Sequence, residues 1–206
     1  MTDKHRRFLG PVVEMRKLHD SAEQRIVHSA EMLDRKSLAS VGDTTGERLT
    51  ALLTETKAHT PEELAANVAR IGELLGRFAL YVPARFTDDP AEQAKYWAVR
   101  SGIFPAVGGS RPAGTTCLSE DVAFHIEDLP RATAELQALI ARHGYDACIY
   151  GHALEDNYHF IINQSFSPPA EVARYEALMN DVAELVSAGT TARSKPSMAR
   201  GATWRP

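Results

Sequence analysis

A short polar turn between two apolar runs constrains the fold of this chain more than any other feature. The stretch 151–163 reads GHALEDNYHFIIN, and apolar residues occupy 147–150 before it and 160–162 near its end. Asp156 and Asn157, at its centre, are residue types that favour tight turns. Apolar runs of this length on both sides of such a turn are typical of two strands. The sequence therefore predicts an antiparallel β-hairpin here.

Two histidines, His152 and His159, lie on either side of this turn. Side chains on one face of a hairpin come close together, so the two imidazoles can meet. Neutral imidazole is the commonest metal ligand in proteins, and a closed site needs one or two further ligands. Histidines in a half-buried hairpin are also often structural residues with ordinary hydrogen bonds. Spacing alone favours that structural role, and the metal-site hypothesis depends on the residues around the pair.

Caps and apolar periodicity place further helices and strands along the chain. Thr60 and Pro61 begin a helix in which apolar residues recur at helical spacing. The predicted helices cover 61–78, 90–104, 128–143 and 169–186, with a weaker pattern at 11–30; the predicted strands cover 51–57, 79–86 and 117–126, and the predicted loops 39–50 and 105–116. Helices and strands that interleave around a tight hairpin favour an α+β fold, a mainly antiparallel sheet with helices packed on one side.

Length and charge limit the class of protein. A chain of 206 residues forms one domain by default and two at most. The net charge of −4, without a long basic run, argues against nucleic acid or an anionic membrane surface as a partner. Cys117 and Cys148 lie in apolar runs and are expected to be reduced core residues. With no signal peptide and no run near the ~20 apolar residues of a transmembrane segment, we expect a cytoplasmic protein.

The residues around the two histidines resemble a family signature. GHALEDNYHF is similar to the GHAxxxNxHF motif of the C-terminal (cap) domain of FAD-linked oxidases, the family of D-lactate and D-2-hydroxyacid dehydrogenases. The resemblance spans about 31–186 and includes EMLDRKSL at 31–38, ALLTETKAHTPEELAANVARI at 51–71 and KYWAVRSGIFPAVGGSRPAGTTCLSEDVAF at 95–124. It is closest to the D-lactate dehydrogenases that carry FAD and an iron–sulfur domain. It implies a truncated domain of this family at 31–187, after an unassigned segment 1–30 and before a disordered tail 188–206.

The resemblance implies roles for the histidines. In such enzymes His152 and His159 would bind a divalent metal such as zinc, which holds the hydroxyl and carboxylate of a small 2-hydroxyacid beside the flavin. The third ligand in that family is a glutamate in a later KAEHG motif, whose histidine is the base. Neither residue is present here, so we expect no retained catalytic residue and weak metal binding.

Other polar residues are candidates for the substrate site. Arg100 matches an arginine that pairs with the substrate carboxylate, and a solvated arginine is the alternative. Arg111 is a second anion-binding candidate. Asn157 contacts substrate or flavin, or serves only the turn, and Asp156 replaces a residue that is often glycine in the family. Glu120 and Asp121 point to opposite faces of a strand, so one of them can orient a histidine while at least one is exposed to solvent; we assign the orienting role to Glu120.

The FAD-binding parts of such enzymes have no counterpart in this sequence. We find no glycine-rich dinucleotide fingerprint and no cysteine cluster for an iron–sulfur centre. FAD would therefore be bound mainly by a domain absent here, and a separate FAD-binding chain is a candidate partner. We expect the substrate- and metal-binding cap domain of an FAD-dependent D-2-hydroxyacid dehydrogenase, acting on D-lactate and inactive alone. The alternatives are a non-functional truncated relic and a free-standing weak metal-binding module.

The tail 190–206, TTARSKPSMARGATWRP, shows neither helical nor strand periodicity. Resembling enzymes have a segment of the form YDGSLKAEHGTGRNMAP at this point. With suitable synonymous codons, a coding sequence for that segment, read one base later, translates into the whole of this tail. The sequence therefore predicts a frameshift between about 186 and 190 that destroyed the KAEHG motif. The alternative is an ordinary disordered terminus.

Overall fold

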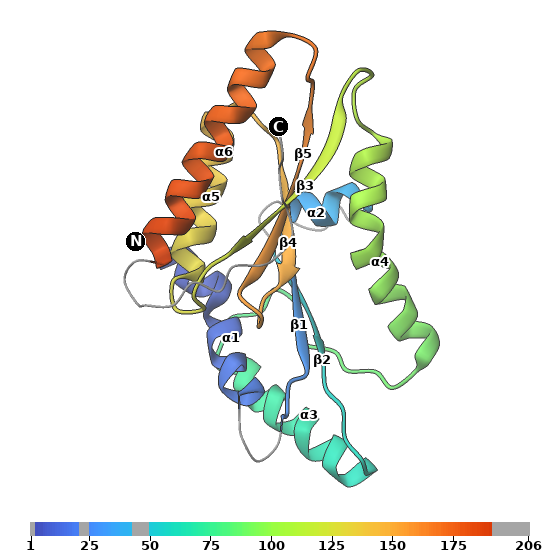
Figure 1. Ribbon diagram of the computed structural model, residues 1–206. Helices are drawn as coiled ribbons and strands as arrows, with labels where there is room; N and C mark the ends of the chain where they lie inside the picture. The colour runs from blue at the N-terminus through green and yellow to red at the C-terminus, as the bar shows by residue number, and fades with distance from the viewer. Residues whose placement is uncertain (1–2, 21–24, 43–49, 191–206) are drawn as a thin grey trace.

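A five-stranded antiparallel sheet forms the centre of the molecule in the computed structural model, which describes residues 3–20, 25–42 and 50–190 (Figure 1). The strands are β1 (Ser29–Leu33), β2 (Ala51–Glu55), β3 (Thr116–Ala123), β4 (Cys148–His152) and β5 (Asn157–Gln164). Their order across the sheet is β2-β1-β4-β5-β3, and every neighbouring pair is antiparallel. This arrangement confirms the expected α+β class and the antiparallel sheet.

The helices are α1 (Asp3–His19), α2 (Arg35–Ser40), α3 (Pro61–Leu75), α4 (Pro90–Gly109), α5 (Leu129–Arg142) and α6 (Pro169–Thr190). Figure 1 shows α5 and α6 side by side against one face of the sheet, and α4 on the other side. Helices α1, α3, α5 and α6 contribute to the larger core on the first face. Helices α2 and α4 contribute to a smaller core on the second face, so helices lie on both sides of the sheet and not on one side only, as the sequence predicted.

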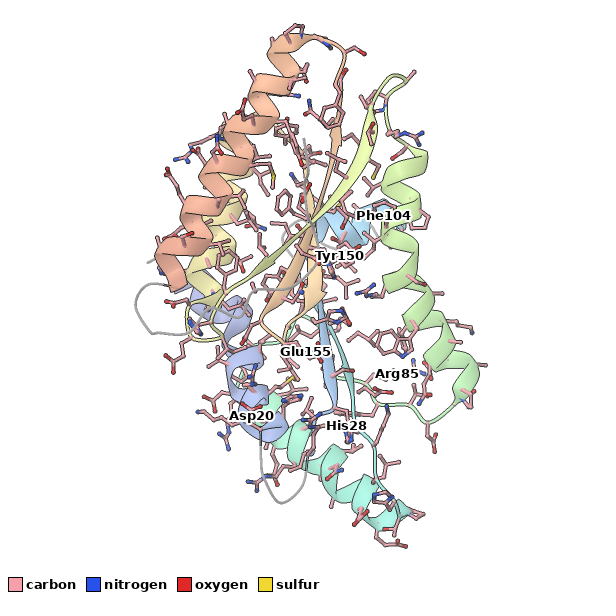
Figure 2. The ribbon with its side chains drawn as sticks, viewed as in Figure 1. Asp20, His28, Arg85, Phe104, Tyr150 and Glu155 are labelled. Atoms are coloured by element: carbon pink, nitrogen blue, oxygen red, sulfur yellow. The ribbon has the colours of Figure 1, made fainter. Side chains whose placement is uncertain are left out.

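Strand alternation separates the two cores. On β5, Tyr158, Phe160 and Ile162 enter the larger core, whereas Ile161 enters the smaller one. Tyr150 on β4 joins the smaller core and points toward α4 (Figure 2). Because β4 and β5 are buried on both faces, their sequences read as near-continuous apolar runs, which made the hairpin recognisable from sequence.

Three predicted elements differ from the structure. Residues 79–86 form no strand, although most of them are apolar; several of their side chains are exposed. The predicted loop 105–116 is helical up to Gly109, because α4 continues through Pro105 and packs Val107 against the smaller core. The predicted helix 11–30 is displaced: α1 ends at His19, and β1 begins within that range.

The two cysteines are free thiols, as expected. Burial raises the pKa of Cys148 to about 12, so this thiol stays neutral at physiological pH. Within the described ranges, no helix is long and apolar enough to cross a membrane. The predicted tail falls outside these ranges from residue 191 onward, and α6 extends to Thr190.

The β4–β5 hairpin depends on Gly151. A Cβ at this position would lie 2.6 Å from the carbonyl oxygen of Asn157 and 2.9 Å from Cα of Tyr158, both backbone atoms. Its φ of +152° also lies in a region that side-chain-bearing residues rarely adopt. Only glycine lets the two strands approach this closely beside His152.

We expect Gly151→Ala to separate β4 from β5 at this point, since backbone atoms cannot move aside like a flexible side chain. The variant should lose about 2 kcal/mol or more of unfolding free energy in urea. Gly109→Ala, where an added Cβ meets nothing within 4 Å, is the control. Equal stability of the two variants would contradict the close approach.

Candidate functional site on the second face of the sheet

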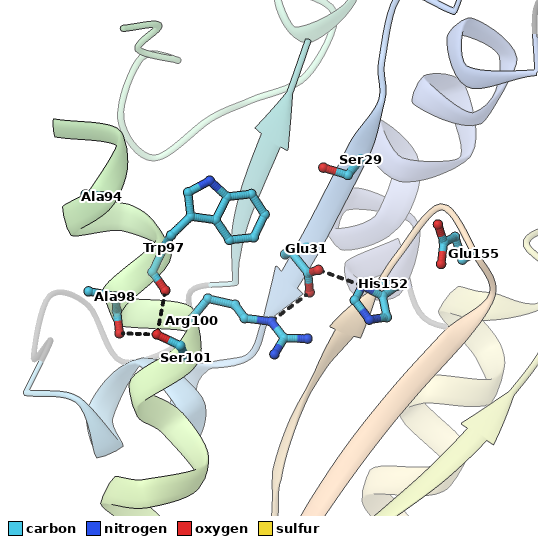
Figure 3. Close-up of a pocket in the computed structure, with 9 residues that line it drawn as sticks. All are labelled: Ser29, Glu31, Ala94, Trp97, Ala98, Arg100, Ser101, His152 and Glu155. Atoms are coloured by element: carbon cyan, nitrogen blue, oxygen red, sulfur yellow. Dashed lines mark hydrogen bonds and ion pairs between the residues drawn. The ribbon is translucent and has the colours of Figure 1, made fainter. Parts of the chain in front are cut away.

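Glu31 is a buried carboxylate at the centre of this site, with 3% of its surface exposed. Its Oε2 lies 3.3 Å from Nε of Arg100 on α4, and its Oε1 lies 2.6 Å from Nδ1 of His152 on β4. The strand register places Glu31 directly opposite His152. A buried carboxylate is costly unless it is paired, so one charge on β1 holds groups from two other elements in place (Figure 3).

The two histidine rings lie on the same face of the sheet, in contact with each other. Their centroids are 5.7 Å apart with an interplanar angle of 79°. His159 stands opposite Asp121 of β3, and its Nδ1 contacts the Asp121 carboxylate. Each imidazole therefore has Nδ1 against a carboxylate, His152 with Glu31 and His159 with Asp121. A carboxylate at Nδ1 favours the tautomer that carries the free lone pair on Nε2.

Tyr150 joins the arginine to the histidines. The Cζ of Arg100 lies 5.2 Å from the centroid of the Tyr150 ring, within the range of cation–π contacts. The Tyr150 ring lies 5.3 Å from that of His159, its partner across the β4–β5 register. Burial raises the pKa of the Tyr150 phenol, so it stays protonated at neutral pH.

An open cleft of about 970 Å³ lies between α4 and the ends of β1 and β4 (Figure 3). Its walls carry both polar and apolar side chains. The lining residues are Ser29, Glu31, Ala94, Trp97, Ala98, Arg100, Ser101, His152 and Glu155. Among them Arg100 is the one Lys or Arg, so an anion in this cleft would meet Arg100 and His152 together.

The donor set fits part of a metal site. Two imidazoles with carboxylate partners at Nδ1 have the arrangement usual for metal-ligating histidines. The described residues, however, contain no group of three or more histidine, cysteine, aspartate or glutamate side chains that could hold a metal ion. Two neutral nitrogens alone make a weak site.

The structure places Arg111 and Glu120, two further residues predicted for the site, away from the histidines. Arg111 lies away from the cleft: it donates to the carbonyls of Gly108 and Thr115 and so closes the carboxyl end of α4. Glu120 faces the opposite side of the sheet, where it accepts a hydrogen bond of 2.6 Å from the hydroxyl of Tyr175 on α6. The assignment of Glu120 as the histidine's partner is therefore wrong, because strand alternation gives that place to its neighbour in sequence.

Asn157 begins β5, two residues before His159, and alternation puts both on one face. Its Oδ1 is buried and has no hydrogen-bond partner in the part of the chain that the structure describes. A buried carbonyl oxygen without a partner costs about 1–3 kcal/mol.

Sequence reasoning missed two residues of this site, Glu31 and Tyr150, and chose Glu120 where the structure has Asp121. Glu31 carried a signal, since an acidic residue inside the apolar strand SAEML is unusual unless it is paired. For Asp121 the choice against Glu120 needed the strand register. Tyr150 has the pattern of a core residue and gave no sequence signal of its own.

The comparisons with known proteins cover nearly the whole chain. The family model for the C-terminal domain of FAD linked oxidases matches residues 15–190, beginning inside the segment that sequence analysis left unassigned. A solved structure, 4-ethylphenol oxidase from Gulosibacter chungangensis in an isoeugenol complex, is similar with a TM-score of 0.52 and 12% identity. The match covers 92% of this chain and 42% of that one, so the chain spans less than half of it. This likeness concerns the fold alone. Comparison with curated proteins gave no match.

We expect Arg100→Met to destabilise the protein by about 1–3 kcal/mol, because Glu31 stays buried with one partner fewer. Adding Glu31→Gln should recover most of this loss, since it removes the uncompensated charge. Urea unfolding of both variants measures the effect.

Arg85→Met is the matched control, because the Arg85–Glu92 pair lies on the surface, where ion pairs contribute little to stability. If the double variant is no more stable than Arg100→Met, the ion pair does not carry the effect.

Proposed function

We propose a function from the premise that this chain belongs to the family of C-terminal domains of FAD-linked oxidases. In this proposal the chain is the substrate-side domain of a cytoplasmic FAD-dependent D-2-hydroxyacid dehydrogenase, with D-lactate as the preferred substrate. The FAD is bound mainly by a separate domain or chain. When bound, the flavin supplies the acceptor for the hydride that leaves the α-carbon of the substrate.

One observation carries this proposal: Arg100 and His152 are held side by side at one cleft by the same buried carboxylate, Glu31. The bond to Glu31 uses Nε of Arg100, which leaves the Nη groups for a substrate carboxylate. The imidazoles of His152 and His159 then face the neighbouring hydroxyl. A 2-hydroxyacid has both groups on adjacent carbons, which suits a cation and an imidazole held by the same carboxylate at one cleft.

The cleft does not fit the diphosphate of FAD. Such a group needs several cations or a row of backbone N–H groups at a helix start. Among the described lining residues Arg100 is the one Lys or Arg, and it is paired with Glu31. We therefore assign to this chain only the side of the site that contacts substrate.

The partner domain would cover an exposed apolar surface beside the cleft. We define the α4 surface as the exposed large apolar residues of α4 and the loop before it: Leu80, Tyr81, Val82, Phe86, Tyr96, Trp97, Val99 and Phe104. Among the described residues, all exposed large apolar side chains except Phe166 and Val172 belong to it. Exposed large apolar residues concentrated on one helix and its preceding loop are candidates for an interaction site. Trp97 also lines the cleft, so a flavin-binding domain on this surface would close the site.

In this proposal the chain binds a divalent metal only weakly. His152 and His159 would hold it through their Nε2 atoms, and it would act as a Lewis acid on the substrate hydroxyl. We further propose that the tail 190–206 results from the one-base frameshift, which removed the third ligand and the base. On this view the present chain is inactive even with its partner.

Two other functions remain as outcomes of the experiments. A truncated relic would bind neither substrate nor partner. A free-standing metal-binding module would retain metal through purification but would not respond to D-lactate. Metal content separates these two, and binding of D-lactate or of an FAD-binding domain by the present chain separates both from the proposed substrate-side domain.

The purified chain should be colourless and should show no flavin absorbance after incubation with FAD, because it offers no cradle for the diphosphate. Absorbance spectroscopy after gel filtration measures this. A yellow protein with one FAD per chain would overturn the assignment of FAD to another domain.

Reading the coding DNA tests the frameshift directly: a one-base shift between about 186 and 190 should restore a KAEHGTGR-like stretch. A chain expressed in the restored frame should bind zinc at least tenfold more tightly than the present chain, since it regains a third ligand. Isothermal titration with zinc measures the difference. If neither neighbouring frame encodes such a stretch, the frameshift hypothesis is wrong.

The restored chain, mixed with a recombinant FAD-binding domain of the family, should reduce an artificial dye in the presence of D-lactate. Arg100→Met in that chain should lower kcat/KM by about 10²–10³-fold, the value of a charge-assisted pair with the substrate carboxylate. The control Arg131→Met should change it little, since Arg131 pairs with Glu135 on α5, outside the cleft. Activity that is equal in both variants would contradict the role of Arg100.

A further inference from the structure

We propose that Arg16 and Asp156 form a clamp that positions the two histidines from the opposite side of the sheet. Arg16 lies on α1, whose neighbouring residues Val12 and Met15 are buried in the larger core. Its Nη1 donates to the carbonyl of Leu154 and lies 3.3 Å from Oδ1 of Asp156. Both acceptors belong to the turn between the histidines. A helix that gave no functional signal in the sequence thus holds the hairpin that carries the site.

The backbone of Asp156 has a strained conformation that the contact with Arg16 stabilises. Its φ is +62°, and it is the one described residue other than glycine with a positive φ. The left-handed conformation costs a residue with a side chain roughly 1–2 kcal/mol. In this conformation the carbonyl of Asp156 accepts a hydrogen bond of 2.9 Å from the N–H of Phe124, which follows β3. The Arg16 guanidinium offsets part of the strain by pairing with the carboxylate.

Burial makes the carboxylate of Asp156 depend on that arginine. Desolvation raises the pKa of Asp156, and the nearby charge of Arg16 opposes this shift. Arg16 is itself fixed in place, since its Nε lies 2.6 Å from Oδ2 of Asp20, one helical turn later. The guanidinium therefore reaches the turn already oriented.

The turn transmits its conformation to the histidines through short connections. The N–H of Glu155 donates to the carbonyl of His152 at 3.0 Å, and the N–H of Ala153 donates to the carbonyl of Ala30 at 2.8 Å. Leu154 is buried in the larger core. A change of conformation at Asp156 would therefore shift both ends of the turn, and with them the spacing of the His152 and His159 rings.

This inference rests on the proposed function, because it concerns the same pair of histidines, but its test uses neither flavin, metal nor substrate. The full chain carries Arg16→Met, Asp156→Gly, or both. NMR of histidine-labelled protein detects the contact between the two rings, and hydrogen exchange follows the Glu155 N–H. We expect Arg16→Met to abolish the ring contact and to speed this exchange about tenfold, the value of one lost hydrogen bond.

The double variant decides between positioning and simple anchoring of α1. Glycine adopts a positive φ without cost and has no carboxylate to pair, so Asp156→Gly should make the turn independent of Arg16. We expect Arg16→Met with Asp156→Gly to restore the ring contact and the slow exchange. If Arg16→Met does not fold, Arg16→Lys takes its place in the same pair of measurements.

Lys17→Ala is the matched control, because the ion pair of Lys17 with Glu14 lies within α1. It should leave the ring contact unchanged. An unchanged ring contact in Arg16→Met would overturn the proposal. A lost contact that Asp156→Gly does not restore would also overturn it, since Arg16 would then act only by anchoring α1.

Discussion

The pairing of one buried carboxylate, Glu31, determines how the second face of the sheet is built. Helix α4 packs on this face through few side chains, with Ile103 fully buried and Val107 partly buried against the smaller core. Its contact through Arg100 supplies an attachment midway along the helix, where the side chains around it are exposed. The same carboxylate orients His152. Without this charge, neither the cleft nor the orientation of its arginine would follow from packing.

The two faces of the hairpin divide the tasks of stability and chemistry. Tyr158, Phe160 and Ile162 are buried in the larger core and fix β5 firmly. Burial of these side chains also fixes the pairing register of β5, since a slip of one position would reverse the faces. His159, at an alternate position of the same strand, is therefore held on the second face. The apolar face thus provides the precision that the polar face requires. This is why a site can lie on a sheet face that has only a small core of its own.

The sequence predicted the parts of the structure that depend on local patterns. The hairpin, the capped helix α3, whose N-cap is Thr60, and the antiparallel sheet follow from turn residues, caps and apolar periodicity. The pairing of Glu31 with Arg100 joins segments far apart in the chain, and no local pattern encodes it. The choice of Asp121 over Glu120 required the register of β3, because a shift of one residue exchanges the faces on which these two side chains lie. The apolar run 79–86 resembles a strand, but the structure gives it no neighbouring strand to pair with.

Three departures from ordinary folding rules gather at one end of the β4–β5 hairpin. Glu31 is a charge inside an apolar strand, Asp156 adopts a left-handed conformation, and Asn157 has a buried oxygen without a described partner. Each costs stability, and packing alone would favour an apolar residue, a glycine and a paired amide at these positions. Of the three, Glu31 lines the cleft, whereas Asp156 pairs with Arg16 on the opposite side of the sheet, and buried atoms of His28 and Asn163 also lack a partner among the described residues. The position of Glu31 beside His152 therefore supports a ligand-binding site independently of any motif, because functional sites retain features that oppose stability.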